Sequence, residues 1–385
     1  MEIYLDNSAT TKPYPKVCES MVRAMEEDYY NPSSIYRDGV LVQKKIERYR
    51  EYIANTLKCS SKEILFTSGG TESINTAIFS VEKSKKKHII TSMIEHPATL
   101  QAMKKMEQLG FDVTYIKPLK NGCVTADEVL KFITENTCLV SLMAVNNELG
   151  SKTDVVKIAT QAKKTNSNII VHIDAVQAYL KLKLFVNENV IDFLSASGHK
   201  IHGPKGIGIL YHRNGVKLSP HIVGGGQEMN FRSGTENVPG IFGLGTAVEE
   251  FYPHMDDKIK YIQTVKEYLK DSLVKKIPYI KILSPQDSVC HILNVSFLGV
   301  RGEVLLHSLE SEGICVSTGS ACSSKKAGSH VLGALEFTKQ EKDGAIRFSL
   351  SEYNTIEEMD IVVKALEKNV NMIRTVMNFG KGRHV

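Results

Sequence analysis

Two charged side chains at the ends of apolar stretches could together hold one cofactor. Asp174 ends the apolar run Ile169–Ile173, and Lys200 follows the run Phe193–Ala196 and a Ser-Gly turn. A lysine in such a place can be partly buried with a lowered pKa, which Schiff-base chemistry requires. A carboxylate at a strand end needs a cationic partner to offset its desolvation, and a pyridinium nitrogen, an arginine or a metal ion would serve. The alternatives are a turn residue for Asp174 and a solvated side chain for the lysine.

A glycine-containing turn earlier in the chain could bind a phosphate group. The sequence Phe66-Thr-Ser-Gly-Gly-Thr71 ends an apolar run and opens an expected helix. Glycine lets backbone N–H groups approach an anion closely, and the helix dipole favours negative charge at this end. Gly70 and Thr71 would form the cradle, and Ser197 and His199 beside the lysine offer further donors. The alternative is an ordinary strand–helix turn that Thr71 caps.

The phosphate-type turn, the strand-end acid and the lysine follow one another in the order that suggests pyridoxal phosphate chemistry. This cofactor stores electrons from a broken Cα bond only while its ring nitrogen stays protonated, and an anionic Asp174 would keep it so. The turn, the acid and the lysine together indicate this cofactor much more specifically than any one of them does. Lys205 is the rival lysine, but it lies between Pro204 and Gly206 in an expected surface turn, so we favour Lys200.

Further polar side chains follow or interrupt other strand-like runs. His96 comes after the run His88–Thr91 and could stack on a flat cofactor ring or move protons, although a lone histidine is more often structural. Asn147 has a similar place and could donate to a ring oxygen or a substrate carboxylate, whereas Asn146 is the possible turn former. Arg347 lies inside a strand pattern, and its guanidinium group suits bidentate capture of a carboxylate, with a structural ion pair as the alternative.

One cysteine lies in a stretch of small and polar residues, Gly319-Ser-Ala-Cys322. Lys325 and Lys326 would favour its thiolate, which is the reactive form, whereas Cys315 belongs to an apolar run and is expected to be inert. A cysteine in an exposed polar loop is a poor core residue. We therefore predict that Cys322 is functional.

The glycine-rich stretch 224–235 is too long for a simple hairpin. Arg232 and Thr235 within it could contribute hydrogen-bond donors to an anion. A plain surface loop is the alternative.

The composition indicates a globular chain and excludes several classes of protein. Of the 385 residues, 42% are hydrophobic and 24% are charged, and the net charge is only +5, which gives no support for nucleic-acid binding as the main task. The seven cysteines are odd in number and irregularly spaced, so no disulfide framework is expected, and without a Cys-x-x-Cys pair we expect no zinc or other metal site. No apolar run reaches about 18 residues and the N-terminus lacks a signal-peptide pattern, so we expect a cytoplasmic protein without a membrane span.

Apolar runs alternate with amphipathic stretches up to Glu250, which predicts an α/β domain with a mostly parallel sheet covered on both faces. The expected strands are Glu63–Phe66, His88–Thr91, Asp112–Ile116, Leu139–Val145, Ile169–Ile173, Phe193–Ala196 and Gly208–Tyr211, with helices such as Thr71–Val81, Ala98–Leu109 and Asp154–Thr165 between them. The pattern then changes to that of a smaller α+β domain, with a boundary near Phe251–Asp257. Its expected elements are the helices Lys258–Lys275 and Ile356–Met377 and the strands His291–Phe297, Ile314–Ser317 and Ala345–Ser349.

These residues make the chain resemble the cysteine desulfurases, which belong to the class V aminotransferase group of pyridoxal phosphate enzymes. The resemblance covers almost the whole chain, and its motifs are Tyr4-Leu-Asp-Asn-Ser-Ala-Thr-Thr11, Asn31-Pro-Ser-Ser34, Ser197-Gly-His-Lys200, Arg232-Ser-Gly-Thr-Glu-Asn237 and Gly319-Ser-Ala-Cys322. The last motif resembles the nitrogen-fixation and iron–sulfur-cluster type. The resemblance implies the fold type I of pyridoxal-phosphate-dependent transferases, with an N-terminal arm (1–15) that joins the small domain, a large cofactor-binding domain (16–255) and a small C-terminal domain (256–385) that carries the cysteine loop.

The resemblance also implies a role for each candidate residue. Lys200 would hold the cofactor covalently and take the Cα proton, Asp174 would pair with the pyridinium nitrogen, and His96 would stack on the ring and take part in catalysis. The phosphate would be bound by Gly70, Thr71, Ser197, His199 and, from the other subunit of a homodimer, Thr235. Gln177 would hydrogen-bond the ring oxygen, Asn147 would contact cofactor and substrate, Arg347 would hold the substrate carboxylate, and Cys322 would be the sulfur-accepting nucleophile.

The implied activity is removal of sulfur from L-cysteine, which yields L-alanine and a persulfide on Cys322 for transfer to an acceptor. The acceptor would be a scaffold for iron–sulfur cluster assembly or a tRNA-thiolating enzyme, without direct binding of nucleic acid. The alternatives are a selenocysteine lyase, another class V aminotransferase, or a non-catalytic scaffold. The short basic stretch 377–385 does not resemble the longer tail with which some members dock a cluster scaffold, so the acceptor stays open.

Overall fold

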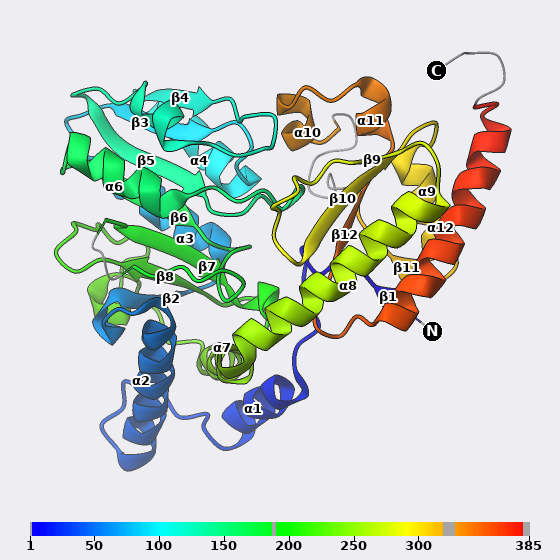
Figure 1. Cartoon of the computed structure of the whole chain (residues 1–385). Coiled ribbons are helices and arrows are strands. Elements are labelled where there is room, and N and C mark those ends of the chain that lie inside the picture. The colour runs from blue at the N-terminus through cyan, green and yellow to red at the C-terminus, as the bar shows by residue number, and fades with distance from the viewer. Residues whose placement is uncertain (1, 187–189, 319–327, 380–385) are drawn as a thin grey trace.

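The computed structural model of the chain describes residues 2–186, 190–318 and 328–379, and it is built around a large sheet and a smaller one. In Figure 1 helices lie on both sides of the large sheet, and the smaller sheet stands beside it together with the long helices α8 (Met255–Lys276) and α12 (Ile356–Val376). Among the described residues no helix has the length and apolar character that a membrane crossing requires.

The large sheet has seven strands in the order β2-β8-β7-β6-β5-β3-β4. Their bounds are β2 (Ile64–Thr67), β3 (His88–Ser92), β4 (Asp112–Ile116), β5 (Thr137–Met143), β6 (Ile170–Asp174), β7 (Phe193–Ser197) and β8 (Gly208–His212). Neighbours from β4 to β7 are parallel, and β8 runs antiparallel to both β7 and β2. The prediction of a mostly parallel sheet is confirmed, and the antiparallel β8 makes the sheet mixed. The strand expected at Leu139–Val145 ends earlier, because the chain leaves the sheet after Met143 to form the turn at Asn146.

Successive strand residues point to opposite faces of the sheet, so each face carries its own apolar core. Val140 and Leu142 pack with the core that includes α2 and α7, whereas Leu139, which directly precedes Val140, packs with α3 and α4. The helices around this sheet are α1 (Pro15–Glu26), α2 (Arg37–Leu57), α3 (Gly70–Phe79), α4 (Pro97–Gln108), α5 (Ala126–Leu130), α6 (Val155–Thr165) and α7 (Val238–Phe251), with short 3₁₀ turns at Ser61–Glu63, Gly198–Lys200, Glu228–Asn230 and Tyr252–His254. Burial on both faces explains why the strands read as continuous apolar runs.

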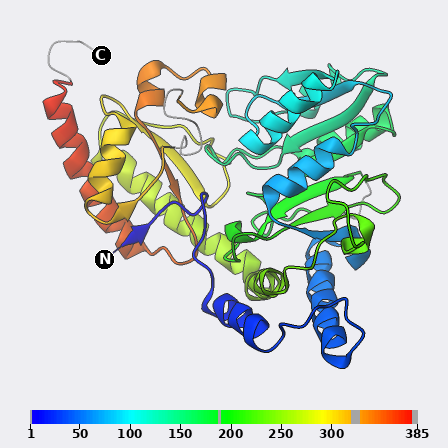
Figure 2. The ribbon, with the colours of Figure 1, turned by 180° about the vertical axis from the view of Figure 1, so that it is seen from behind.

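The smaller layer contains a three-stranded antiparallel sheet, β12-β10-β9, and a short parallel pair, β1-β11. Its strands are β1 (Ile3–Tyr4), β9 (Ile280–Ile282), β10 (Ile292–Phe297), β11 (Ile314–Cys315) and β12 (Ala345–Ser349), and its remaining helices are α9 (Gly302–Glu310), α10 (His330–Ala334) and α11 (Lys339–Asp343). An apolar core of its own fills the space between this sheet and α8, α9 and α12. Because β1 pairs with β11, the first residues of the chain contact this layer, as Figure 2 shows from behind.

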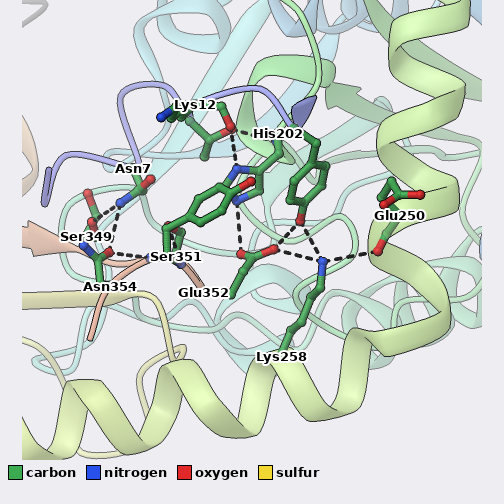
Figure 3. A network of polar contacts seen from close by, with 12 residues as sticks. Asn7, Lys12, His202, Glu250, Lys258, Ser349, Ser351, Glu352 and Asn354 are labelled. Atoms are coloured by element: carbon green, nitrogen blue, oxygen red, sulfur yellow. Dashed lines mark hydrogen bonds and ion pairs between the residues drawn. The ribbon is translucent and has the colours of Figure 1, made fainter. Parts of the chain in front are cut away.

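A polar network joins the two layers around the carboxyl group of Glu352 (Figure 3). Lys258 Nζ lies 3.0 Å from Glu352 Oε1, His202 Nε2 lies 3.1 Å from Oε2, and the Tyr14 hydroxyl donates a hydrogen bond to Oε1. Burial by itself would raise the pKa of Glu352, but the hydrogen bonds and charges of His202, Tyr14 and Lys258 hold it well below its usual value. His202 thus links α1 and the segment after β12 to the loop that carries Lys200.

Replacing Glu352 with glutamine should lower the free energy of unfolding by about 3 kcal/mol at neutral pH, because the mostly buried Lys258 would lose its carboxylate. A carboxyl group whose folded-state pKa is lowered stabilises the fold above its unfolded-state pKa and loses this effect as the pH falls. The difference between the two proteins should therefore shrink below about pH 4.3. Urea unfolding in neutral and acidic buffer measures it, with the exposed Glu19→Gln as the control. A stability difference that does not change with pH would contradict the prediction.

Candidate active site

The carboxyl ends of parallel strands in the large sheet open into one cavity of about 290 Å³. Its walls come from the segments after β3, β5, β6 and β7 on one side and from β12 and the start of α10 on the other. The cavity is lined by these residues predicted from the sequence: Gly70, Thr71, His96, Asn147, Asp174, Gln177, Ser197, His199, Lys200 and Arg347. Every predicted site residue except Thr235 and Cys322 therefore faces the same space.

The N-terminus of α3 forms a cradle for an anion at one end of the cavity. The first backbone N–H groups of a helix have no partner within the helix, and here they belong to Gly70 and the residues that follow it. A Cβ atom at Gly70 would lie 2.8 Å from Val176 Cγ2, so the close packing requires glycine. Ser197 and His199 line the same space, and burial, with the charge of Lys200, lowers the pKa of His199 to about 4. These donors suit a phosphate group.

Lys200 and Asp174 lie at the ends of neighbouring strands. Lys200 is in the 3₁₀ turn after β7, and its Nζ donates to the carbonyl oxygens of Ser8 and Ala9, each at 2.6 Å. Asp174 is the last residue of β6 and is 5% exposed, and its Oδ1 accepts a hydrogen bond of 2.9 Å from Val176 N. The amine and the carboxyl group are thus fixed on the same cavity by adjacent parallel strands.

The cavity residues fit pyridoxal phosphate. Burial raises the pKa of Asp174 to about 6, although the Val176 N–H and the charge of Lys200 oppose the rise; a cationic ring nitrogen would stabilise the carboxylate. Oε1 of Gln177 is buried and has no hydrogen-bond partner within the part of the chain that the structure describes. The cradle, the amine and this carboxyl group are therefore arranged for the cofactor's phosphate, aldehyde and ring nitrogen. The described residues contain no cluster of His, Cys, Asp or Glu side chains suited to a metal ion.

His96 is the N-cap residue of α4 and lines the cavity beside Lys200. Its Nδ1 accepts a hydrogen bond of 3.1 Å from the backbone N–H of Ala98. Burial, together with the charges of Lys200 and His330, lowers the pKa of His96 to about 4. Since Nδ1 accepts, the ring proton of this neutral imidazole lies on Nε2.

Arg347 and Asn147 contact each other where they line the cavity. Arg347 Nη1 donates to the carbonyl oxygen of Asn147 at 2.9 Å, Nη2 pairs with Asp6 Oδ1 at 2.6 Å, and Nε is buried without a partner among the described residues. The structural ion pair considered for Arg347 thus exists, and the arginine lines the cavity as well. Asn146 is the turn former, because its Oδ1 accepts the backbone N–H groups of Glu148 and Leu149.

Two predicted site residues are not placed in the cavity. Thr235 is exposed and does not line the cavity of its own chain. Cys322 lies outside the described residues. Of the other candidates, Lys205 is exposed, and Arg232 Nε pairs with the carboxylate of Glu72 at 3.0 Å.

Sequence reasoning missed several residues that line the cavity, namely Ser8, Ala9, Glu148, Ser329 and His330. Ser8 and Ala9 act through backbone carbonyl groups, which any residue type provides. His330 carried a signal that was overlooked, since a histidine soon after the cysteine stretch predicted to be functional is a candidate for proton transfer.

A family model described as aminotransferase class-V matches residues 3–362. A protein named cysteine desulfurase from Nostoc sp. is 40% identical over 98% of this chain and 95% of its own length, and one named cysteine desulfurase IscS from Dictyoglomus turgidum is 41% identical over 97% and 96%. Among solved structures, a NifS-like protein has a TM-score of 0.91 at 38% identity and covers 97% of this chain and 100% of its own. SspA in complex with cysteine has a TM-score of 0.82 at 34% identity over 92% of this chain and 100% of its own.

Proposed function

The chain belongs to the aminotransferase class-V family, and on this premise we propose that it is a pyridoxal-phosphate-dependent cysteine desulfurase that converts L-cysteine to L-alanine. The observation that carries the proposal is the meeting of Lys200, the buried Asp174 and the α3 anion cradle in one cavity. The names of the relatives support the same activity, and one similar protein, SspA, was solved in complex with cysteine.

In this proposal, some cavity residues bind the cofactor, one moves a proton and others bind the substrate. The N-terminus of α3 with Ser197 and His199 binds the cofactor's phosphate, and Asp174 keeps a proton on its ring nitrogen, so that the bound cofactor can withdraw electrons from Cα. Lys200 Nζ holds the cofactor and, once released, takes the Cα proton while the carbonyl oxygens of Ser8 and Ala9 orient it. Asn147 and Arg347 hold the substrate carboxylate.

We further propose that the sulfur atom moves from Cβ of the substrate to Cys322, and from there as a persulfide to an acceptor protein. The net change balances without an outside oxidant, because cysteine and one thiol become alanine and one persulfide. The six described cysteines are all free thiols, as in reducing compartments, which supports a cytoplasmic enzyme.

A homodimer is also part of the proposal, with Thr235 reaching the partner subunit's phosphate cradle. Helices α1 and α2 and the loop between them project from the large sheet in both views (Figures 1 and 2). They carry exposed apolar side chains, which are Val22, Met25, Tyr29, Ile35, Tyr36, Val40 and Leu41. An exposed apolar surface of this kind is typical of a protein–protein contact.

Incubating the purified enzyme with L-cysteine and a thiol reductant tests the function. We expect L-alanine and sulfide in equal amounts, because each turnover moves one sulfur atom to the acceptor thiol and the reductant frees it. Amino-group transfer to a 2-oxo acid without sulfide would contradict the proposal and favour an aminotransferase. A reaction restricted to L-selenocysteine would instead identify a selenocysteine lyase.

A further inference from the structure

The backbone of Arg347, the residue given to the substrate carboxylate above, is fixed on both sides. In β12 it is paired with Asn294 of β10, and on the other side its N–H donates at 2.6 Å to the carbonyl oxygen of Ser317. The strand fixes the direction of the side chain at Cα, but several rotatable bonds separate Cα from the guanidinium group. Contacts of the guanidinium group itself must therefore decide where its N–H donors lie.

Two acceptors hold this guanidinium group. Asp6 Oδ1 lies 2.6 Å from Nη2, and the carbonyl oxygen of Asn147 accepts a hydrogen bond of 2.9 Å from Nη1. The side chain of Arg347 is 5% exposed, so these contacts are largely shielded from water. Within the part of the chain that the structure describes, they use two of the five N–H donors, and the buried Nε has no partner. Donors therefore remain for a ligand of the cavity that Arg347 lines.

Asp6 holds the guanidinium group from outside the cavity. It is not among the residues that line the cavity, so its carboxylate does not share the space of a bound substrate. Its backbone forms a bridge with Ser349, and its carbonyl oxygen accepts the Ala9 N–H at 2.9 Å and the Tyr4 hydroxyl at 3.1 Å. A carboxylate that is fixed in this way can orient Arg347 while other N–H groups of the arginine bind a ligand.

A second acid would attract Arg347 if Asp6 were absent. Glu148 lines the cavity, and the charge of Arg347 acts on it. Burial raises the pKa of Glu148 to about 7, although the hydrogen bond with Ser329 and the charge of Arg347 oppose the rise. An arginine without its Asp6 partner could ionise Glu148 and pair with it, because a buried charge requires a partner. Such a pair would occupy the N–H donors that a substrate carboxylate needs.

The turn that contains Asp6 also holds the lysine. The carbonyl oxygens of Ser8 and Ala9 each accept a hydrogen bond of 2.6 Å from Lys200 Nζ. One short segment, 6–9, therefore positions both the carboxylate-binding arginine and the amine proposed to hold the cofactor. An α-amino acid carries its carboxylate and its amine on one carbon atom, so a fixed spacing between these two groups of the enzyme suits this class of substrate.

We propose that Asp6 is a positioning residue for substrate recognition. It holds the guanidinium group of Arg347 so that the remaining N–H donors meet the carboxylate of an α-amino acid, and it does not contact the substrate itself. The inference rests on the proposed function and specifies which group gives the substrate-binding arginine its orientation.

The test compares the holoenzyme with its variants Asp6→Ala and Asp6→Asn. The probes are L-alanine and ethylamine, which is L-alanine without its carboxylate, and the change in the visible absorbance of the bound cofactor measures the binding of each. Asp6→Ala should bind L-alanine about 10- to 100-fold more weakly, the scale of a hydrogen bond to a charged group, and should bind ethylamine as before. Asp6→Asn should restore much of the lost affinity, because an amide oxygen can accept from Nη2.

A double-mutant cycle shows whether Asp6 acts through Arg347. Arg347→Ala and the double variant Arg347→Ala/Asp6→Ala should bind L-alanine with the same affinity. Glu2→Gln, which changes an exposed acid of the same arm, is the control and should bind both probes as the unsubstituted enzyme does.

Three results would overturn the proposal. Binding of L-alanine to Asp6→Ala that is unchanged or tighter would mean that Asp6 does not orient the arginine. Equal weakening of both probes would indicate a purely structural role. If the unsubstituted enzyme binds L-alanine no more tightly than ethylamine, Arg347 holds no carboxylate. The expected binding results without any sulfide from L-cysteine would refute the desulfurase function and leave the role of Asp6 intact.

Discussion

Replacing Lys200 with alanine is expected to yield a folded protein that holds no covalent cofactor and turns over no L-cysteine. The lysine serves twice in the proposed reaction, as the covalent attachment and as the base for the Cα proton. We therefore expect the rate to fall by about 10⁴-fold or more, the upper end of what one acid–base group contributes. Mass spectrometry after borohydride reduction measures the attachment, because reduction fixes the cofactor to the amine.

Lys205→Ala is the matched control, since this lysine lies in the same segment but is exposed and does not line the cavity. It should keep both the covalent mass and the visible absorbance of the bound cofactor. If Lys205→Ala loses the attachment and Lys200→Ala keeps it, the assignment of the lysine is wrong. If neither loses it, the attachment lies elsewhere and the cavity described above is not the active site.

The sequence predicted the strand-end part of the site because that part depends on local patterns. Asp174, His96 and Asn147 each follow an apolar run, and the carboxyl ends of parallel strands meet at one edge of a sheet. The glycine turn at Gly70 could be recognised in the same way, because glycine is favoured where the backbone must approach a ligand closely. The local sequence was therefore sufficient to predict that these side chains lie close together.

The contacts between the two layers could not be predicted, because they join residues that are far apart in the chain. The hydrogen bond from Arg347 to the carbonyl oxygen of Asn147 and the ion pair between His202 and Glu352 depend on how the smaller sheet packs against the larger one. The contacts of His330 and its neighbour with the loops after β3 and β5 have the same origin. The division of the chain into an arm, a large domain and a small domain, with boundaries after residues 15 and 255, also stays a prediction.

The cysteines that the structure describes are poorly suited to accept sulfur. Among the described cysteines, burial raises the pKa of Cys59 to about 12 and the pKa values of Cys123 and Cys138 to about 11, and it also raises those of Cys290 and Cys315. A thiol with a raised pKa is a poor nucleophile at neutral pH. None of the six described cysteines lines the cavity, so they are poor candidates for the acceptor.

Replacing Cys322 with alanine should therefore abolish sulfide release, with a fall of about 10⁴-fold or more, the scale expected when a covalent nucleophile is removed. Cofactor binding and exchange of the Cα proton should survive, because Lys200, Asp174 and the α3 cradle are unchanged. Without reductant, mass spectrometry of the unsubstituted enzyme after reaction with L-cysteine should show one added sulfur atom on the peptide that contains Cys322. Cys315→Ala is the control and should leave turnover intact, because that thiol contacts Glu2 and has a raised pKa. Undiminished turnover in Cys322→Ala would mean that sulfur leaves the substrate without this thiol, and the persulfide route would then have to be abandoned.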